Sequence, residues 1–192
     1  KKLHRSGTEY ALKVLKRFSE ILNVSKITNL KIIATAVLRE ATDTKPFINE
    51  VEKLFKTKIN ILSGEEEAEC SAEGVKIGFE NVNGLVADLG GGSLELARVE
   101  NNIVTNKTSL PVGVLRLLNN PIVKKRNLAK YIKKLLREEK WLSKKKFNNL
   151  YLVGGTWRAL FKLHLFQNNH PVHIIHQYSI DNNVLSKFVE KI

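Results

Sequence analysis

The segment that most constrains the fold of this chain is residues 85–95, Leu-Val-Ala-Asp-Leu-Gly-Gly-Gly-Ser-Leu-Glu. An apolar run ends in Asp88 and leads into three glycines and a serine, after which a second apolar run begins. Glycines permit positive φ angles and let backbone N–H groups approach an anion closely. Because a hairpin turn needs fewer than three glycines, the segment indicates a phosphate-binding loop, and a plain hairpin is the alternative.

Two carboxylates accompany this loop. Asp88 stands at the end of the first expected strand, where it can hold Mg²⁺ beside a bound phosphate. Glu95 follows Ser93 by two residues and can point back towards the same cavity. The loop is not a Walker loop, because no Gly-Lys-Ser or Gly-Lys-Thr follows it. It is not a dinucleotide-binding loop either, because a strand rather than a helix comes next.

The periodicity of apolar residues predicts an α/β protein with a mixed sheet. Strands are expected at residues 30–36, 59–62, 85–89, 94–100, 103–109 and 150–153. Helices are expected at residues 8–23, 44–55, 64–78, 113–119, 128–142, 156–167 and 181–192. Strands alternate with helices at first, and a three-stranded meander opens the second half, which together favour a mixed sheet with helices on its faces.

A second glycine pair, Gly154 and Gly155, ends the strand expected at residues 150–153 and leads into a helix. Glycines at a helix N-terminus bind anions readily. The alternative is that Thr156 is an ordinary helix N-cap. Two glycine loops at strand ends in one chain favour anion binding more than either loop does alone.

Three glutamates, residues 65–67, open the helix expected at residues 64–78. Residue chemistry alone favours an interaction with the positive end of the helix dipole, with a general base as the alternative. Arg39 follows a strand that we expect to be buried. It could neutralise a phosphoryl group there, or cap the local structure and pair with Glu40.

The chain carries a formal net charge of +13, and most of it lies in residues 124–146. Eleven lysines and arginines occupy this segment, opposed only by Glu138 and Glu139. Such a patch would attract a polyanion: nucleic acid, an anionic membrane or a phosphate chain. Because the chain is also rich in asparagine and isoleucine, as A/T-biased codons produce, a solvated lysine-rich surface is the alternative.

The rest of the composition excludes several classes of protein. A single cysteine, Cys70, excludes an intramolecular disulfide framework and indicates a reducing compartment. No apolar run approaches the roughly 18 residues needed to span a bilayer, and no signal peptide follows the basic N-terminus. We therefore expect a cytoplasmic protein with no membrane partner. The absence of methionine predicts that the chain does not begin at a natural start codon.

Taken together, these segments resemble the Ppx/GppA phosphatase family of exopolyphosphatases and guanosine pentaphosphate phosphohydrolases. The matching stretches run in the family's order and are residues 34–41, 63–68, 88–96, 109–117 and 154–160. The weaker match His176-Gln177-Tyr178 has glutamine where the family has glycine. The resemblance implies an actin/Hsp70/sugar-kinase-like (ribonuclease H-like) fold, with two α/β lobes around a cleft.

The resemblance also implies a role for each candidate residue. Glu67 matches the catalytic base for the attacking water, which overrides the dipole interpretation, and Arg39 matches the arginine that meets the phosphate being cleaved. Asp88 matches the aspartate associated with the metal, usually Mg²⁺. Glu95 matches the catalytic carboxylate that supports the phosphate loop, and it is expected to hold the metal together with Asp88. The phosphate-binding residues that the resemblance implies are Gly90, Gly91, Gly92, Ser93, Gly155 and Thr156.

Departures from the family pattern shape the expected domains. The family begins with a strand and an Asp-x-Gly-Ser-type phosphate loop, which this chain lacks, and the family's C-terminal helix is also missing. We therefore expect residues 1–64 to form a partial first lobe. Residues 65–192 are expected to form a second lobe without its C-terminal part. A homodimer or a complementing fragment is the expected protein partner.

The expected activity is release of terminal phosphate from inorganic polyphosphate or guanosine pentaphosphate by metal-assisted attack of water. In this interpretation the basic segment guides an anionic chain to the cleft. One alternative is an inactive remnant that at most binds such phosphates. Another is a nucleic-acid-binding protein, which no known reader motif supports.

Overall fold

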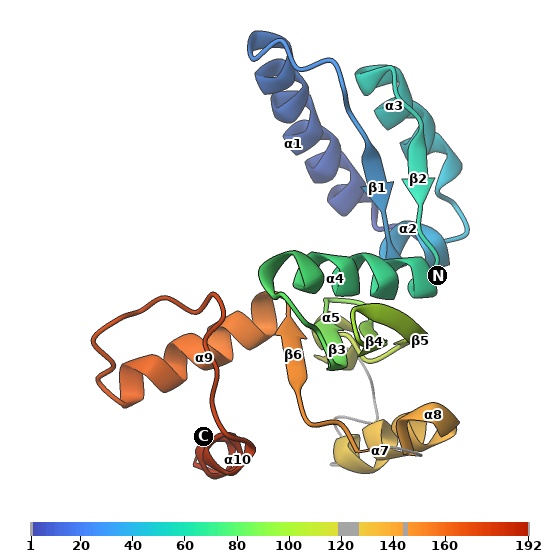
Figure 1. Cartoon of the computed structure of the whole chain (residues 1–192). Coiled ribbons are helices and arrows are strands. Elements are labelled where there is room, and N and C mark those ends of the chain that lie inside the picture. Colours follow the sequence, from blue (N-terminus) through green and yellow to red (C-terminus); the bar gives the residue numbers. More distant parts are fainter. Residues whose placement is uncertain (1, 119–126, 144–145, 192) are drawn as a thin grey trace. The chain divides into compact units, whose positions relative to one another are not determined.

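A computed structural model describes residues 2–118, 127–143 and 146–191 of the chain (Figure 1). The chain divides into two compact units, Lys1–Glu67 and Ala68–Ile192. The division falls inside one helix, α4 (Gly64–Gly78). The lobe boundary expected between residues 64 and 65 stays a prediction.

The first unit is built on a two-stranded parallel sheet. Its elements are α1 (Arg5–Val24), β1 (Ile32–Ala34), α2 (Ala36–Glu40), α3 (Lys45–Phe55) and β2 (Ile59–Ile61). β1 pairs with β2, with Ile32 opposite Ile59, and α1 packs against α3. A proline is tolerated in the first turn of α3 because the N–H it lacks would have no partner there.

The strand expected at residues 30–36 is shorter and less buried than predicted. β1 covers three residues, and from Thr35 the chain enters α2, a short helix that the apolar pattern did not indicate. Ile33 is 55% exposed, because two strands alone leave part of their apolar surface uncovered. Arg39 therefore lies on a helix rather than directly after a buried strand.

Glu52 joins α3 to the start of β2. Its Oε1 accepts a hydrogen bond from the Ile59 amide at 3.0 Å, and its Oε2 pairs with Lys58 Nζ at 2.8 Å. The Lys58 side chain, followed by the Ile59 backbone amide, holds the pKa of the Glu52 carboxyl below its ordinary value of 4.5. The ionised carboxylate is therefore the form that stabilises this connection.

We expect Glu52→Gln to lower the free energy of unfolding at neutral pH, and the difference from wild type to fade in acid. Because the pKa is lower in the folded chain, the stabilisation is present above the unfolded-state pKa and is lost as the pH falls through the folded-state value. Urea unfolding midpoints across this range check the prediction. Glu50→Gln removes the same charge from an exposed site on α3 and is the control. A difference that does not change with pH would contradict the assignment.

The second unit is built on a four-stranded mixed sheet. After α4 come β3 (Gly84–Leu89), β4 (Leu94–Glu100), β5 (Ile103–Leu110), α5 (Val114–Leu118), α7 (Leu128–Glu138), α8 (Lys140–Ser143), β6 (Leu150–Val153), α9 (Gly155–Gln167) and α10 (Asn182–Val189). The strand order is β5-β4-β3-β6. β3, β4 and β5 form the antiparallel meander that the sequence predicts, and β6 joins β3 in parallel.

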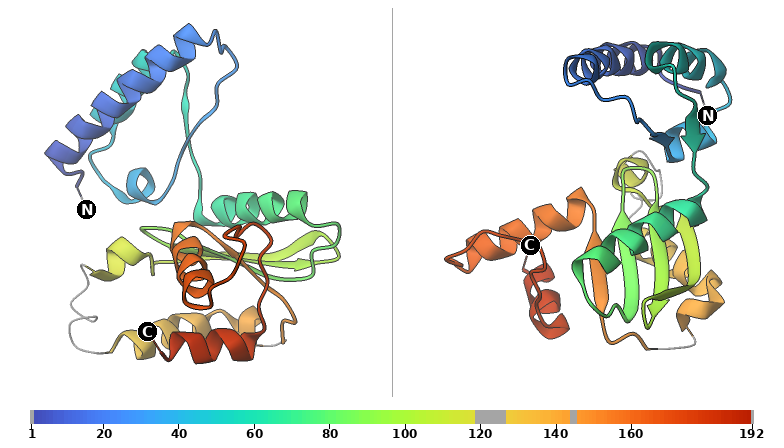
Figure 2. Two further views of the ribbon diagram at one scale, coloured as in Figure 1. Left: turned by 90° about the vertical axis from the view of Figure 1, so that its left-hand side faces the viewer. Right: turned by 45° about the horizontal axis from the view of Figure 1, so that its top comes forward.

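Helices cover both faces of this sheet. On one face, Val86 and Ala97 pack against two buried alanines of α4, which crosses the strands in Figure 2. On the other face, Ala87 and Leu96 pack against apolar residues of α7 and α8. Successive strand residues point to opposite faces, so alternate positions of the same strands build the two cores.

The helix expected at residues 128–142 is interrupted at Glu139. This residue has φ −80° and ψ 87°, which ends α7. Its carboxylate accepts hydrogen bonds from Thr108 of β5 at 2.9 Å and from the Trp141 indole of α8 at 3.1 Å. One side chain thus links the end of α7 to the sheet and to the next helix.

In the part of the chain that the structure describes, no helix is long and apolar enough to cross a bilayer. Within the basic segment, residues 124–126 and 144–145 lie outside the described residues, as does the last residue of the helix expected at 113–119.

Candidate functional site

The carbonyl groups of the glycine loop between β3 and β4 are held by the start of α5. The amides of Val114 and Arg116 donate to the carbonyls of Gly90 and Gly91, each at 3.1 Å. The Arg116 side chain donates from Nε to the Gly92 carbonyl at 2.5 Å. Three successive loop carbonyls are therefore occupied by one short helix, which fixes the orientation of the peptide groups.

The loop is a hairpin turn and a candidate anion site at the same time. The Gly90 amide donates to the Ser93 carbonyl at 3.0 Å, which closes the turn. Among the described residues, no backbone or side-chain acceptor bonds to the amides of Gly91 and Gly92. Successive backbone N–H groups of this kind form a concave site for an anion. A phosphate oxygen bound to these two amides would therefore displace no hydrogen bond among the described residues.

The loop glycines do not have positive φ, which corrects one reason inferred from the sequence, and close packing involves Gly91 and Gly113. Among the described glycines, those with positive φ are Gly84 and Gly154, and neither belongs to this loop. A Cβ on Gly113, just before α5, would lie 2.3 Å from backbone atoms of Gly92. A Cβ on Gly91 would lie 3.1 Å from a leucine side chain of α5. The loop therefore packs directly on the backbone before α5.

Asp88 and Glu95 are direct neighbours across β3 and β4, so their side chains point to the same face of the sheet. Asp88 Oδ2 accepts a hydrogen bond from Ser71 Oγ of α4 at 2.7 Å. Glu95 Oε1 accepts one from Ser109 Oγ of β5 at 2.8 Å, and the residue is only 2% exposed. Two serines, neither of which the sequence analysis singled out, thus orient the two carboxylates.

The two carboxylates suit a hard divalent cation. Mg²⁺ usually binds through one or two carboxylates, with waters and substrate phosphates completing its shell. Asp88 and Glu95 supply two such groups next to the glycine loop. Within residues 2–118, 127–143 and 146–191, no three His, Cys, Asp or Glu side chains gather into a group that could hold a metal ion. Water and phosphate oxygens would therefore provide the remaining ligands.

We expect Ser71→Ala to lower the free energy of unfolding by about 1.5–3 kcal/mol, the usual contribution of a hydrogen bond to a charged group. A double-mutant cycle with Asp88→Ala isolates the Ser71–Asp88 interaction, and a coupling energy above about 0.5 kcal/mol is expected for side chains in contact. Ser186→Ala on the exposed side of α10 is the control. Strict additivity of the two changes at Ser71 and Asp88 would rule out the bond.

Gly154, the first glycine of the second glycine pair, lies close to Asp88. Gly154 has φ 108°, and a Cβ there would lie 2.9 Å from Asp88 Oδ1 and 3.0 Å from the Leu89 carbonyl oxygen. Gly154 is the N-cap of α9, so the alternative in which Thr156 is the N-cap is wrong. Gly155 and Thr156 form the exposed first turn of α9, and their predicted role in phosphate binding stays a prediction.

In the first unit, Arg39 and Glu67 form an ion pair. Arg39 Nη1 donates to Glu67 Oε2 at 3.0 Å and to the Leu62 carbonyl oxygen at 2.8 Å. The two side chains are 23% and 20% exposed, so the pair is partly shielded yet accessible to water. The two residues are 28 positions apart in the sequence, so no local pattern predicts this contact. In the structure it joins α2 to the start of α4.

A capping box separates the roles of the neighbouring glutamates. The Ser63 amide donates to Glu66 Oε2 at 2.7 Å, and the Glu66 amide donates to Ser63 Oγ at 3.2 Å. This reciprocal pair is the usual way in which a Ser-x-x-Glu sequence begins a helix. Glu66 therefore caps α4, whereas Glu67 lies against Arg39.

Gln177 occupies a backbone conformation that favours glycine. Its φ is 56°, in the left-handed region, and the family pattern has glycine at this position. The Gln177 side-chain amide donates to the carbonyl oxygen of Gly78 at the end of α4. This bond helps to offset the conformational cost of a residue with a Cβ.

Comparison with solved structures places this fold. The chain superimposes on an exopolyphosphatase from Cytophaga hutchinsonii with a TM-score of 0.78 and 22% identity, covering 89% of this chain and 58% of that one. A Ppx/GppA family member from Aquifex aeolicus gives a TM-score of 0.65 at 22% identity, with 93% and 57% covered. The predicted fold class, an α/β protein with the actin-like fold, is confirmed.

Curated relatives also match the sequence, among them one from Aeromonas hydrophila and one from Fusobacterium nucleatum. The guanosine-5'-triphosphate,3'-diphosphate pyrophosphatase of Aeromonas hydrophila is 38% identical over 120 residues, 62% of this chain and 24% of the relative. The bifunctional 3-dehydroquinate synthase/phosphatase of Fusobacterium nucleatum is 30% identical over 209 residues, 99% of this chain and 31% of the relative. The chain thus spans a quarter to a third of these relatives.

The family model described as the Ppx/GppA phosphatase family matches residues 1–192. This match covers both structural units, the Arg39–Glu67 pair of the first and the glycine loop of the second. The family that the sequence resembles is therefore confirmed: the chain belongs to the Ppx/GppA phosphatase family.

Proposed function

We propose that this chain provides the site of a phosphoanhydride hydrolase that removes terminal phosphate from inorganic polyphosphate or guanosine pentaphosphate. The observation that carries the proposal is the glycine loop, in which α5 holds the carbonyls and the amides of Gly91 and Gly92 have no partner among the described residues. Phosphoryl transfer depends mainly on positioning and on stabilising charge at the phosphoryl oxygens. Fixed amide donors supply that kind of stabilisation.

Glu67 is proposed as the base that accepts the proton of the attacking water. The ion pair with Arg39 at 3.0 Å orients its carboxylate, because one nitrogen of the guanidinium bonds both Glu67 and a backbone carbonyl. A guanidinium carries five N–H donors. In the proposed mechanism, the N–H groups on Nε and Nη2 donate to the phosphoryl oxygens while Nη1 holds Glu67. Arg39 thus contacts both the base and the substrate.

Asp88 and Glu95 are proposed to hold Mg²⁺. When bound, the ion would neutralise charge on the substrate phosphates. The chain's own contribution is to fix both carboxylates on one face of the sheet, with Ser71 and Ser109 as hydrogen-bond donors. Gly154 leaves room beside Asp88 Oδ1, where a side chain would intrude.

The names of the relatives support either substrate. The matched solved structure is named an exopolyphosphatase, and the curated Aeromonas relative is named for a guanosine triphosphate diphosphate. We propose polyphosphate and guanosine pentaphosphate as the two substrates to compare. A cytoplasmic location also stays a proposal.

The direct test is phosphate release by the purified chain from each substrate, with Mg²⁺ and with a chelator. Release that requires the metal and differs between substrates supports the proposal and selects the substrate. Binding of either substrate without release of phosphate would instead support the alternative that the chain is an inactive remnant that only binds phosphates. Neither binding nor release, by a chain shown to be folded, would contradict the proposed function.

A further inference from the structure

Helix α7 turns a cationic face away from the sheet. Its apolar residues Ile132, Leu135 and Leu136 pack against the sheet core. Four basic residues of the same helix are exposed, and they are Lys130, Lys133, Lys134 and Arg137. At 3.6 residues per turn, spacings of three, four and seven place these four side chains on one face. One face of α7 thus packs against the sheet core, and the opposite face presents positive charge.

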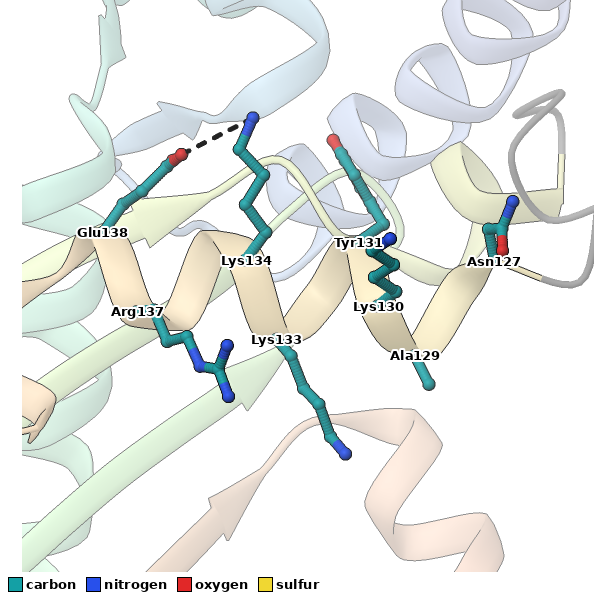
Figure 3. A pocket seen from close by; sticks show the side chains of 8 residues that line it. All are labelled: Asn127, Ala129, Lys130, Tyr131, Lys133, Lys134, Arg137 and Glu138. Atoms are coloured by element: carbon teal, nitrogen blue, oxygen red, sulfur yellow. Dashed lines mark ion pairs between the residues drawn. The ribbon is translucent and has the colours of Figure 1, made fainter.

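This cationic face lines a hollow of about 800 Å³ (Figure 3). Of the charged residues that line it, the four basic ones face a single carboxylate, that of Glu138. Figure 3 shows Lys134 reaching towards Glu138, 3.8 Å away, whereas Lys133 and Arg137 extend together in another direction from the same exposed side of the helix. The described lining of the hollow therefore keeps a net positive charge with the Lys134–Glu138 ion pair included.

The chemistry of the hollow favours a phosphate chain over a nucleic acid. Proteins that bind single strands combine a positive groove with aromatic side chains on which bases stack. Tyr131, the aromatic residue that lines this hollow, is partly buried and packs against the sheet core. Trp141 on the next helix also packs there, with its indole N–H bonded to Glu139. Because Tyr131 packs against the core, the hollow offers bases little stacking surface, and its charge suits an anion that has no bases.

The α7 surface is separate from the candidate catalytic carboxylates. α7 packs with Ala87 and Leu96 on one face of the sheet. Asp88 follows Ala87 on β3, and Glu95 precedes Leu96 on β4, so both carboxylates point to the opposite face of the sheet. On that face, Ser71 of α4 donates a hydrogen bond to Asp88. A ligand on α7 would therefore not occupy the position assigned to the phosphate being cleaved.

We propose that the cationic face of α7 (Lys130, Lys133, Lys134 and Arg137) is a second, non-catalytic binding surface for the chain of inorganic polyphosphate. The proposal deepens the proposed function, since it favours polyphosphate over guanosine pentaphosphate as the substrate. Each cation–phosphate contact releases counterions and adds affinity, so a long chain gains more from this face than a nucleotide does.

The test measures binding of long-chain polyphosphate in the presence of a chelator, so that no metal-dependent hydrolysis is required. The α7 variant is Lys130→Gln, Lys133→Gln and Arg137→Gln together. The control variant is Lys13→Gln, Lys16→Gln and Arg17→Gln, which removes the same charges from exposed positions of α1. The slope of log affinity against log salt is expected to fall by about 2 in the α7 variant, near 0.7 for each lost contact, and to stay near wild type in the control.

Three outcomes would overturn the proposal. They are equal losses in both variants, no loss in the α7 variant, and equally tight binding of single-stranded RNA through the same residues. Lys130→Arg with Lys133→Arg keeps the charge and is expected to keep binding, which separates lost charge from a misfolded helix. Failure of phosphate release with α7-dependent binding intact would contradict the proposed function and leave this surface standing.

Discussion

Replacing Gly113 with alanine is expected to lower the free energy of unfolding by about 3 kcal/mol or more, the upper part of the range for overpacking. The added Cβ would lie 2.3 Å from backbone atoms of Gly92, and no rotamer change can relieve a clash with the backbone. The loop must then move away from α5 and give up the bonds from Val114 and Arg116 to its carbonyls. Urea unfolding measures the loss, and phosphate binding is expected to fall with it.

Gly74→Ala is the matched control for this prediction. Gly74 lies inside α4, and a Cβ there would meet no atom within 4 Å. Alanine in a helix interior is more stable than glycine by about 0.5–1 kcal/mol, so this variant is expected to gain stability. If Gly113→Ala were also neutral or stabilising, that result would contradict the close packing of the glycine loop against the backbone before α5.

Glu67→Gln is expected to lower the rate of phosphate release by about 10² to 10⁴, the range for removal of a general base. Glutamine keeps the shape of the side chain and an oxygen that can accept the bond from Arg39 Nη1, so the fold is expected to survive. What is lost is the capacity to take a proton from water. Single-turnover phosphate release with Mg²⁺ measures the effect, and circular dichroism checks the fold.

Glu65→Gln provides the comparison within the same helical turn. Glu65 is exposed and has no role in the proposed chemistry, and the variant also removes one negative charge near the helix N-terminus. Its rate is expected to stay within a small factor of wild type. Equal rates for Glu67→Gln and the wild-type chain, zero included, would remove Glu67 from the mechanism.

Much of the local structure could be predicted from the sequence because local signals determine it. The expected strands at residues 94–100 and 150–153 and the expected helix at residues 64–78 have the same bounds as β4, β6 and α4. Each is an apolar or periodic run that ends in glycine, asparagine or serine, and such turn residues mark boundaries well. For α4, the Ser63–Glu66 capping box fixes the first residue.

Features that depend on contacts between distant segments could not be predicted in this way. The interruption at Glu139 rests on a bond to Thr108 of β5, which no local pattern reveals. The need for glycine at 113 and 154 comes from the backbone of Gly92 and from the Asp88 carboxylate. The glycine spacing marked both loops in the sequence, but the residues that pack against them became visible only in the fold.

The candidate site was predicted in part by chemistry and in part by resemblance. Residue types alone indicated an anion loop with Asp88 beside it, and the structure joins these in one hairpin. The roles of Arg39 and Glu67 came from the resemblance, because nothing in the spacing of two residues 28 positions apart indicates that they meet. Ser71 and Ser109 were missed, since a serine facing a carboxylate across elements leaves no pattern in sequence.

Because the Trp141 indole is hydrogen-bonded to Glu139, the fluorescence of Trp141 is expected to depend on the position of α7 and α8. The chain has two tryptophans. The indole N–H of Trp141 is held by the carboxylate that also binds β5, whereas the buried indole N–H of Trp157 has no partner among the described residues. With Trp157 replaced by phenylalanine, the emission of Trp141 alone would follow the docking of α7 and α8 on the sheet in real time and without a label.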